Sequence, residues 1–116
     1  MSDAIKTGNK GENLAAEFLQ QKGYELVTRN YRYKHAEIDL IVKRNDVLVF
    51  VEVKTRSSTS FGEPEAFVDT KKAAKIFEVA EQYTYENNWN GNIRFDIVSV
   101  MIGDSNEVVH FEDAIT

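Results

Sequence analysis

Apolar residues recur at helical spacing in two segments of the chain. The first segment, 11–22, carries a single apolar stripe and is followed by Gly23, a residue typical of helix C-caps. The second segment, 70–87, repeats its apolar residues with the same period, and Asp69 precedes it as an N-cap. The pattern therefore predicts two helices, one near the beginning of the chain and one past its middle.

Five further segments are rich in apolar, β-branched and aromatic residues and predict strands. They cover residues 24–33, 36–43, 47–54, 93–101 and 107–112. Valine occupies every second position of 47–54, and Leu48 and Phe50 lie on the opposite face, a pattern typical of a central strand covered on both sides. The sequence thus predicts an α/β protein with the order α-β-β-β-α-β-β, with a loop over 55–67 and a turn over 88–92.

Three charged residues interrupt the second and third predicted strands. Charges inside such strands are costly unless they are paired or bind a ligand. Asn45-Asp46 is predicted to form a two-residue hairpin turn. That turn places Asp39 opposite Glu52, on the face that also carries Lys54, whereas a three-residue loop would shift the register by one and separate these charges.

Opposed carboxylates repel each other in a sheet, so this pair favours a site that binds a cation. Mg²⁺ prefers a few carboxylate ligands, and Asp39 and Glu52 with the backbone carbonyl of Val53 form a suitable set. Lys54 lies two residues beyond Glu52, where its ammonium is able to orient an attacking water or to stabilise charge on phosphorus, and its neutral amine is able to deprotonate that water. These residues predict phosphodiester hydrolysis.

The alternative is an ordinary protein surface, with Glu37 and Lys54 as an exposed pair and the two opposed acids solvated. Apolar neighbours such as Phe50 count against full exposure, and the residues alone leave both interpretations open. Glu12 also has two interpretations. It is either a further acid of the site, carried by the first helix, or an acid favoured in a first helical turn by the helix dipole.

Other charged and aromatic residues have weaker signals. Basic candidates for phosphate contacts are Arg29, Arg32, Arg56 and Lys72, although scattered basic residues more often form an ordinary surface. The aromatic residues Tyr83, Tyr85 and Trp89 are expected to pack the end of the second helix. Arg94 and Asp96 share one face of their strand and are expected to form a structural ion pair.

Composition narrows the class of protein. The chain has 116 residues, 42% of them hydrophobic, and is expected to form one domain over 1–116. It has no apolar run long enough for a membrane span, and its lack of cysteine suits the cytoplasm. Two histidines and no cysteine argue against a zinc site, so we expect any metal to have oxygen ligands.

The formal net charge of −5 argues against a nucleic acid as partner. The distribution of charge weakens that argument, because residues 1–75 hold 13 basic and 11 acidic residues, whereas residues 76–116 hold one basic and 8 acidic residues. The acidity therefore lies mainly outside the charged hairpin, and the acidic C-terminal third is a candidate surface for a protein partner.

The order of these motifs resembles the PD-(D/E)xK nuclease superfamily, which includes Holliday junction resolvases, and most closely its bacterial YraN-like, endonuclease-like branch. The matching pieces are 11-GENLAAEFLQQKGYELVTRNYR-32, 37-EIDLI-41, 50-FVEVKTR-56, Gly62 with Pro64, Lys72 and 94-RFDIVSV-100. They span nearly the whole chain. Ala36 departs from the family pattern, which has glycine there.

The resemblance implies a restriction-endonuclease-like α-β-β-β-α-β core with a mixed central sheet flanked by helices, here with an extra C-terminal strand. It also implies that Asp39 and Glu52 are metal-binding acids, that Lys54 is the catalytic lysine and that Glu12 is the helix-1 acid of the resolvase-like branch.

Three functions follow as hypotheses. The first is a Mg²⁺-dependent nuclease, with Mn²⁺ as a substitute, that cuts DNA, including branched or structured DNA in repair or recombination. The second is a module that binds nucleic acid or a protein partner and retains an inactive or accessory nuclease site. The third is a purely structural α/β protein. Resolvases act as dimers, which leaves a homodimer open.

Overall fold

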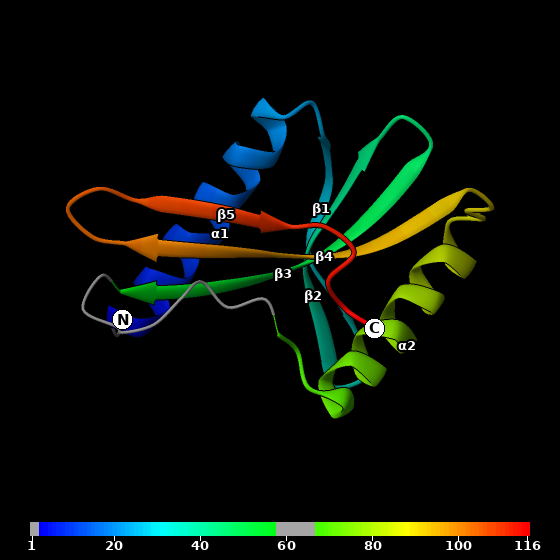
Figure 1. The fold of residues 1–116 in the computed structure, drawn as a ribbon. Coiled ribbons are helices and arrows are strands. Elements are labelled where there is room, and N and C mark those ends of the chain that lie inside the picture. Colours follow the sequence, from blue (N-terminus) through cyan, green and yellow to red (C-terminus); the bar gives the residue numbers. More distant parts are fainter. Residues whose placement is uncertain (1–2, 58–66) are drawn as a thin grey trace.

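The computed structural model describes residues 3–57 and 67–116 of the chain, which form two helices and five strands (Figure 1). The helices are α1 (Asp3–Gln21) and α2 (Thr70–Glu86). The strands are β1 (Glu25–Tyr33), β2 (Ala36–Arg44), β3 (Val47–Ser57), β4 (Asn92–Ile102) and β5 (Glu107–Phe111). The order is the predicted one, and no helix in these ranges has the length and apolar character needed to cross a membrane.

The five strands form one mixed sheet in the order β1-β2-β3-β4-β5. Neighbouring strands are antiparallel except β3 and β4, which are parallel. α2 lies between β3 and β4 in the chain and supplies the crossover that a parallel pair requires. The predicted α/β fold, with helices flanking a mixed central sheet, is confirmed and is consistent with a restriction-endonuclease-like core.

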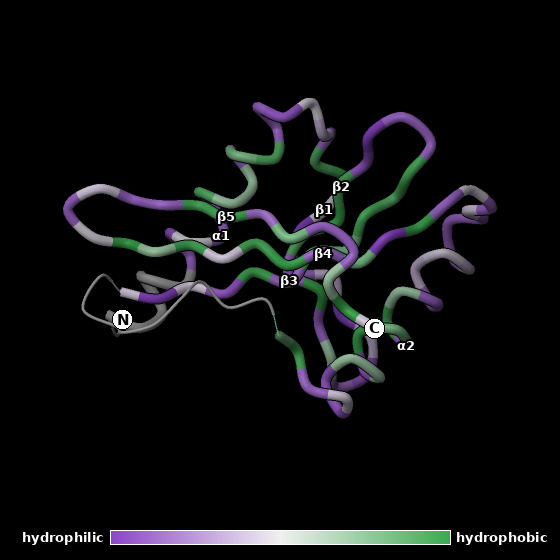
Figure 2. The backbone as a smooth tube through the Cα atoms, in the orientation of Figure 1, coloured by the Kyte–Doolittle hydropathy of each residue, from purple (hydrophilic) through white to green (hydrophobic). Residues whose placement is uncertain are grey.

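Each helix covers its own face of the sheet, so β3 is buried on both sides (Figure 1). Leu19 of α1 lies in one apolar cluster with Val49 and Val51, whereas Ile76 of α2 lies in the other with Phe50. Figure 2 shows the apolar residues concentrated along the central strands. Each fully buried side chain of this size stabilises the fold by roughly 1.5–3 kcal/mol, so the two helices hold β2 and β3 from both sides.

The charged hairpin has the predicted register. Arg44 pairs with Val47 across the turn Asn45-Asp46, and Leu40 pairs with Val51. Asn45 has φ of 56°, a left-handed conformation that asparagine tolerates better than most residues. The local chemistry of the turn therefore suffices to set the register of this hairpin.

The first helix begins at Asp3 rather than at the predicted Gly11. The prediction was wrong at this end because the preceding residues carry little apolar periodicity. Gly11 lies inside the helix and is buried, and a Cβ added there would lie 1.9 Å from Oγ1 and 2.9 Å from Cβ of Thr55. Glycine at this position thus lets α1 approach β3 closely.

Both predicted helix caps are present. Gly23 has φ of 96°, and the Tyr24 N–H donates to the Leu19 carbonyl at 3.0 Å, the arrangement of a Schellman motif. At the other helix, the Asp69 carboxylate accepts from the backbone N–H of Lys72 at 2.8 Å. These caps determine where α1 ends and where α2 begins.

β3 extends beyond the predicted end at Lys54 as far as Ser57. The prediction of a loop from Thr55 was wrong for these three residues, because pairing with β4 continues to Ser57–Ile102 and holds polar residues in the sheet. Residues 58–66 of the predicted loop lie outside the described residues. They include Gly62 and Pro64, which match the family pattern.

The aromatic residues near the end of α2 do not all pack. Tyr83 is buried, and Trp89 packs against the same apolar cluster. Tyr85 is 80% exposed, contrary to the prediction. Two residues along a helix turn a side chain to nearly the opposite side, so Tyr85 cannot share the buried face of Tyr83.

The predicted ion pair between Arg94 and Asp96 is confirmed, with 2.8 Å between the Arg94 guanidinium and Asp96 Oδ2. The Asp96 side chain is fully buried and is also 2.7 Å from Nε2 of His110, while its Oδ1 accepts from the backbone N–H of Asp113 at 2.9 Å. His110 lies on β5, so this carboxylate ties β4 to β5 and to the segment that follows it.

Candidate active site

β2 and β3 separate beyond the pair Leu40–Val51, where their mutual pairing ends. From there β2 continues along β1 and β3 continues along β4, so the sheet forks. Asp39 is the first residue on the β2 arm of this fork and Glu52 is the first on the β3 arm. Beyond this point the facing edges of β2 and β3 are no longer paired with each other, and the carboxylates of Asp39 and Glu52 stand at the start of the gap.

Asp39 and Val53 bridge the two arms. The Asp39 carboxylate accepts a hydrogen bond from the backbone N–H of Val53 at 2.7 Å. The N–H and C=O of one residue in a strand project toward the same edge, so the Val53 carbonyl also faces the fork. An aspartate oxygen and a backbone carbonyl oxygen thus face the space between the arms.

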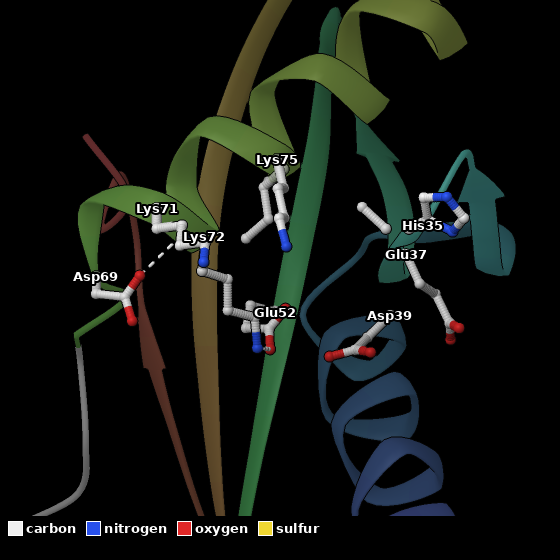
Figure 3. Close-up of a pocket in the computed structure, with 10 residues that line it drawn as sticks. His35, Glu37, Asp39, Glu52, Asp69, Lys71, Lys72 and Lys75 are labelled. Atoms are coloured by element: carbon white, nitrogen blue, oxygen red, sulfur yellow. Dashed lines mark hydrogen bonds and ion pairs between the residues drawn. The ribbon is translucent and has the colours of Figure 1, made fainter.

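An open cavity of about 580 Å³ lies between the fork and α2 (Figure 3). Its described lining residues are His35, Ala36, Glu37, Asp39, Glu52, Asp69, Lys71, Lys72, Lys75 and Ile76. The sheet supplies the acids at the base of the cavity, and α2 supplies three lysines along its side (Figure 3). The two opposed acids of the hairpin are therefore brought together in one concave site.

The environment of Asp39 disfavours its charged form. Burial raises the pKa of the Asp39 carboxyl to about 7, and the neighbouring charge of Glu52 acts in the same direction. The hydrogen bond from Val53 opposes this shift, while the more distant charge of Glu12 adds to it. A carboxyl of this kind holds a proton near neutral pH until a cation compensates its charge.

Glu52 is 7% exposed and pairs with Lys72, whose Nζ lies 2.6 Å from Glu52 Oε1. Burial lowers the pKa of the Lys72 ammonium, but the hydrogen bond and charge of Glu52 outweigh this, and the net shift is upward. Lys72, predicted as a phosphate contact, therefore binds a site acid directly.

Glu12 reaches the β2 side of the fork through Asn30. The Asn30 side-chain amide donates to Glu12 at 3.1 Å and to Glu37 at 2.7 Å. Arg29 lies 3.8 Å from Glu12, and Arg32 Nε lies 2.9 Å from Glu37. Two predicted phosphate contacts thus pair with acids next to Asp39, and Glu12 lies close enough for its charge to act on Asp39.

Lys54 and Arg56 lie farther along β3, both partly buried and in register with Ser99 and Met101 of β4. Lys54 follows Glu52 by two residues on the same strand, as the motif requires, but it is not among the described residues that line the cavity. The structure places these side chains on the β3 arm, and their roles stay predictions.

The sequence did not single out Asn30. It lies within β1 but has φ of 52°, a left-handed conformation that is uncommon for a non-glycine residue. Asparagine is depleted in strands, and its presence within a predicted strand was the available signal. Its amide contacts two acids that come from other elements, Glu12 from α1 and Glu37 from β2, so the contacts depend on the packing of all three elements.

The donor set suits a hard divalent cation. Asp39 and Glu52 with the Val53 carbonyl offer oxygen ligands, and Mg²⁺ commonly uses one or two carboxylates and keeps several waters. No group of three or more acid, histidine or cysteine side chains in the described ranges is arranged as a metal-binding cluster. The Lys72 ammonium already contacts Glu52, so a positively charged group occupies one side of this acid.

The candidate site lies within the part of the chain that matches a known protein family. The sequence model of the "Uncharacterised protein family UPF0102" matches residues 11–100, a range that contains the fork and the part of α2 that lines the cavity. The chain belongs to the UPF0102 family. This is the YraN family, an endonuclease-like family of the PD-(D/E)xK type, so the resemblance seen in the sequence is confirmed.

Curated UPF0102 proteins are similar over most of their length. One from Cytophaga hutchinsonii is 47% identical over 96 residues, covering 83% of this chain and 85% of its own. One from Christiangramia forsetii is 38% identical over 115 residues, covering 98% of this chain and 97% of its own. One from Clostridioides difficile is 45% identical over 96 residues, covering 82% and 84%. UPF0102 proteins of different bacteria therefore share this chain's domain.

Proposed function

We propose that this UPF0102 protein is a Mg²⁺-dependent nuclease that hydrolyses phosphodiester bonds in DNA, with Mn²⁺ as a substitute cation. The observation that carries the proposal is the convergence of Asp39, Glu52 and the edge of Val53 at the fork. Membership of a nuclease-like family supports it. Branched or structured DNA in repair or recombination is the substrate class that the resemblance to resolvases favours.

Asp39, Glu52 and the Val53 carbonyl are the groups that would hold the cation. A bound Mg²⁺ would supply a Lewis acid that polarises a phosphoryl oxygen and lowers the pKa of a bound water. Lys54 orients or deprotonates the attacking water, or stabilises negative charge on the phosphorus centre, from its position beyond Glu52. Glu12 contributes negative charge on the Asp39 side.

Basic residues around the fork would contact the DNA backbone. Arg29 and Arg32 now pair with Glu12 and Glu37, and Lys72 pairs with Glu52. A phosphate is able to replace a carboxylate as the partner of an arginine, because both offer oxygen acceptors that fit the guanidinium. Arg56 extends this basic set along β3. Binding should therefore weaken strongly as salt concentration rises.

Cleavage assays test the proposal directly. The purified protein is incubated with Mg²⁺ or Mn²⁺ and with duplex, single-stranded, flap and four-way-junction DNA, and with RNA of the same sequences. Glu52→Gln and Lys54→Met should each reduce the cleavage rate by about 10²–10³-fold, because each removes charge that acts on the transition state. Glu78→Gln is the matched control, since Glu78 pairs with Lys34 outside the cavity.

Absence of cutting on every substrate, across a range of protein concentrations, would contradict the nuclease proposal. Cutting by all variants at the wild-type rate would point to a contaminating nuclease and would contradict it equally. Cleavage of RNA without cleavage of DNA would support the proposed site but contradict DNA as its substrate.

A second candidate function is a binding module that keeps the site and acts through a protein partner. The acidic C-terminal third favours it, because Glu78, Glu81 and Glu86 are exposed on α2 and would repel nucleic acid. Full biological activity of a Lys54→Met strain would support this module over the nuclease. Light scattering with and without DNA would show whether two copies assemble, as resolvase-like cutting requires.

A further inference from the structure

The cavity contains its own cation. The Lys72 ammonium lies 2.6 Å from Glu52 Oε1, a short charge-assisted contact. The Glu52 side chain is 9% exposed, whereas the Lys72 side chain is 50% exposed. The buried partner is therefore the acid at the base of the fork, and the ammonium comes to it from solvent.

The two partners belong to different elements that both border this cavity. Glu52 lies on the β3 arm of the fork, and Lys72 lies in the first turn of α2, anchored there by the Asp69 cap (Figure 3). Lys72 thus has a fixed backbone and a long side chain that is able to leave Glu52 without any movement of the helix.

We propose that Lys72 is a built-in counter-cation of the site, which occupies Glu52 until a divalent cation takes its place and then turns to a substrate phosphate. The inference rests on the proposed function, because it takes Asp39 and Glu52 as the acids that hold the metal. A metal and an ammonium compete for the same carboxylate oxygen and repel each other at this range. Metal binding therefore releases Lys72 into a cavity where phosphate would lie.

The exchange predicts a specific change in metal affinity. Lys72→Met keeps the length of the side chain and removes its charge, so Mn²⁺ and Mg²⁺ no longer compete for Glu52. Affinity for either cation should rise about tenfold, the size of one charge-assisted contact. In the metal-free variant Glu52 is left buried without this partner, so its melting temperature should fall below that of the wild type and rise more on addition of Mn²⁺.

Lys75→Met is the matched control. Lys75 lines the same cavity from the same helix, yet no ion pair involves it within residues 3–57 and 67–116. Its removal takes one positive charge from the cavity without freeing Glu52. Metal affinity should therefore change less than about twofold, because a solvated charge at longer range is screened.

Calorimetric titration with Mn²⁺ in the absence of nucleic acid measures these affinities for the wild type, Lys72→Met, Lys72→Gln and Lys75→Met. A rise confined to the two Lys72 variants supports the exchange. Equal affinity in wild type and Lys72 variants overturns the exchange and leaves the proposed metal site intact. Failure of every protein to bind Mn²⁺ overturns the metal site and the exchange together.

Amine labelling gives an independent readout of the lysine itself. Acetic anhydride modifies unprotonated, accessible amines, and mass spectrometry reports the extent at each lysine. Mn²⁺ should increase the labelling of Lys72 in the wild type severalfold and leave Lys75 unchanged. Labelling of Lys72 that is unaffected by saturating Mn²⁺ would overturn the exchange.

Discussion

At the scale of single residues, Asp39 is where burial acts most directly on the chemistry of the site. Its carboxyl has a pKa of about 7, raised from 3.8 by burial and by the charge of Glu52. In the unfolded chain the same carboxyl is ionised above about pH 4. Folding therefore takes up a proton at Asp39 between these two values, and the metal-free protein loses stability as the pH rises through about 7.

Replacement of Asp39 by asparagine should remove this dependence. The asparagine side-chain oxygen still accepts from the Val53 N–H, and its amide carries no charge next to Glu52. In EDTA, we expect Asp39→Asn to be more stable than the wild type, by about 2 kcal/mol more at pH 8 than at pH 5. Urea unfolding at the two pH values measures the difference.

Asp104→Asn serves as the control for this comparison, because Asp104 is an exposed acid in the turn between β4 and β5. Its stability should lie within about 0.5 kcal/mol of wild type at both pH values, as for most exposed substitutions. An Asp39→Asn protein that is less stable than wild type at pH 8 would show that its carboxylate is already compensated without metal.

At the scale of elements, the site depends on how closely α1 approaches β3. Gly11 faces Thr55, and this contact sets the height of the first helix above the strand that carries Glu52. The next residue of the helix is Glu12, which Asn30 links to β2. A helix held farther from β3 would move Glu12 away from the fork. The absence of a Cβ at Gly11 therefore helps to position Glu12.

Gly11→Ala should therefore destabilise the protein although alanine is the better helix former by about 1 kcal/mol. The new Cβ would lie within 2.9 Å of the Thr55 Cβ, which rotation of the threonine side chain does not relieve. We expect a net loss of about 1–3 kcal/mol in the free energy of unfolding. The double variant Gly11→Ala/Thr55→Gly should recover part of this loss, as chemical denaturation would show.

Asn13→Ala is the matched control in the same helix, because Asn13 is exposed and only helix propensity changes there. It should leave stability unchanged or raise it slightly. Gly11→Ala with unchanged or increased stability would mean that α1 moves away from β3 at little cost.

At the scale of the whole molecule, a second polar centre joins β4 to β5 and to the segment that follows β5. Asp96 of β4 binds Arg94, His110 of β5 and the backbone of Asp113. His110 also contacts Lys22 at the end of α1, with 2.8 Å between Nδ1 and the ammonium nitrogen. Burial raises the pKa of Asp96, but these partners outweigh it and lower the pKa to about 2.

Asp96→Asn should destabilise the whole molecule, because it removes the buried carboxylate that Arg94 and His110 contact. Among the carboxylates of the described residues, Arg94 keeps only the more distant one of Glu112, at 3.6 Å. We expect a loss of about 3–5 kcal/mol at pH 7 in the free energy of unfolding. The wild-type contribution of Asp96 should vanish as the pH falls through about 2, since an acid with a lowered pKa stabilises only above that range. Denaturant titration beside Asp104→Asn, which should lie within about 0.5 kcal/mol of wild type, measures the effect.

Much of the fold follows from local patterns in the chain. The periods of apolar residues predict every element in its order, and the turn Asn45-Asp46 predicts the register from Arg44–Val47 to Leu40–Val51. The pairing ends there, one position short of the predicted pair Asp39–Glu52. Period and turn chemistry act over a few residues and do not depend on distant contacts. Errors at element ends include Ser57, where pairing with β4 extends the strand beyond its local signal, and Asp3, where the first helical residues carry little apolar periodicity.

The sequence by itself thus determined the elements, the hairpin register and, through family resemblance, the residues of the candidate site. Only the tertiary structure decided that the sheet forks at Asp39 and Glu52, that Asn30 joins Glu12 to Glu37, and that Lys72 occupies Glu52. These contacts join residues that are up to 20 positions apart in the chain and come from different elements. They depend on how helices pack on a twisted sheet, which no local pattern specifies.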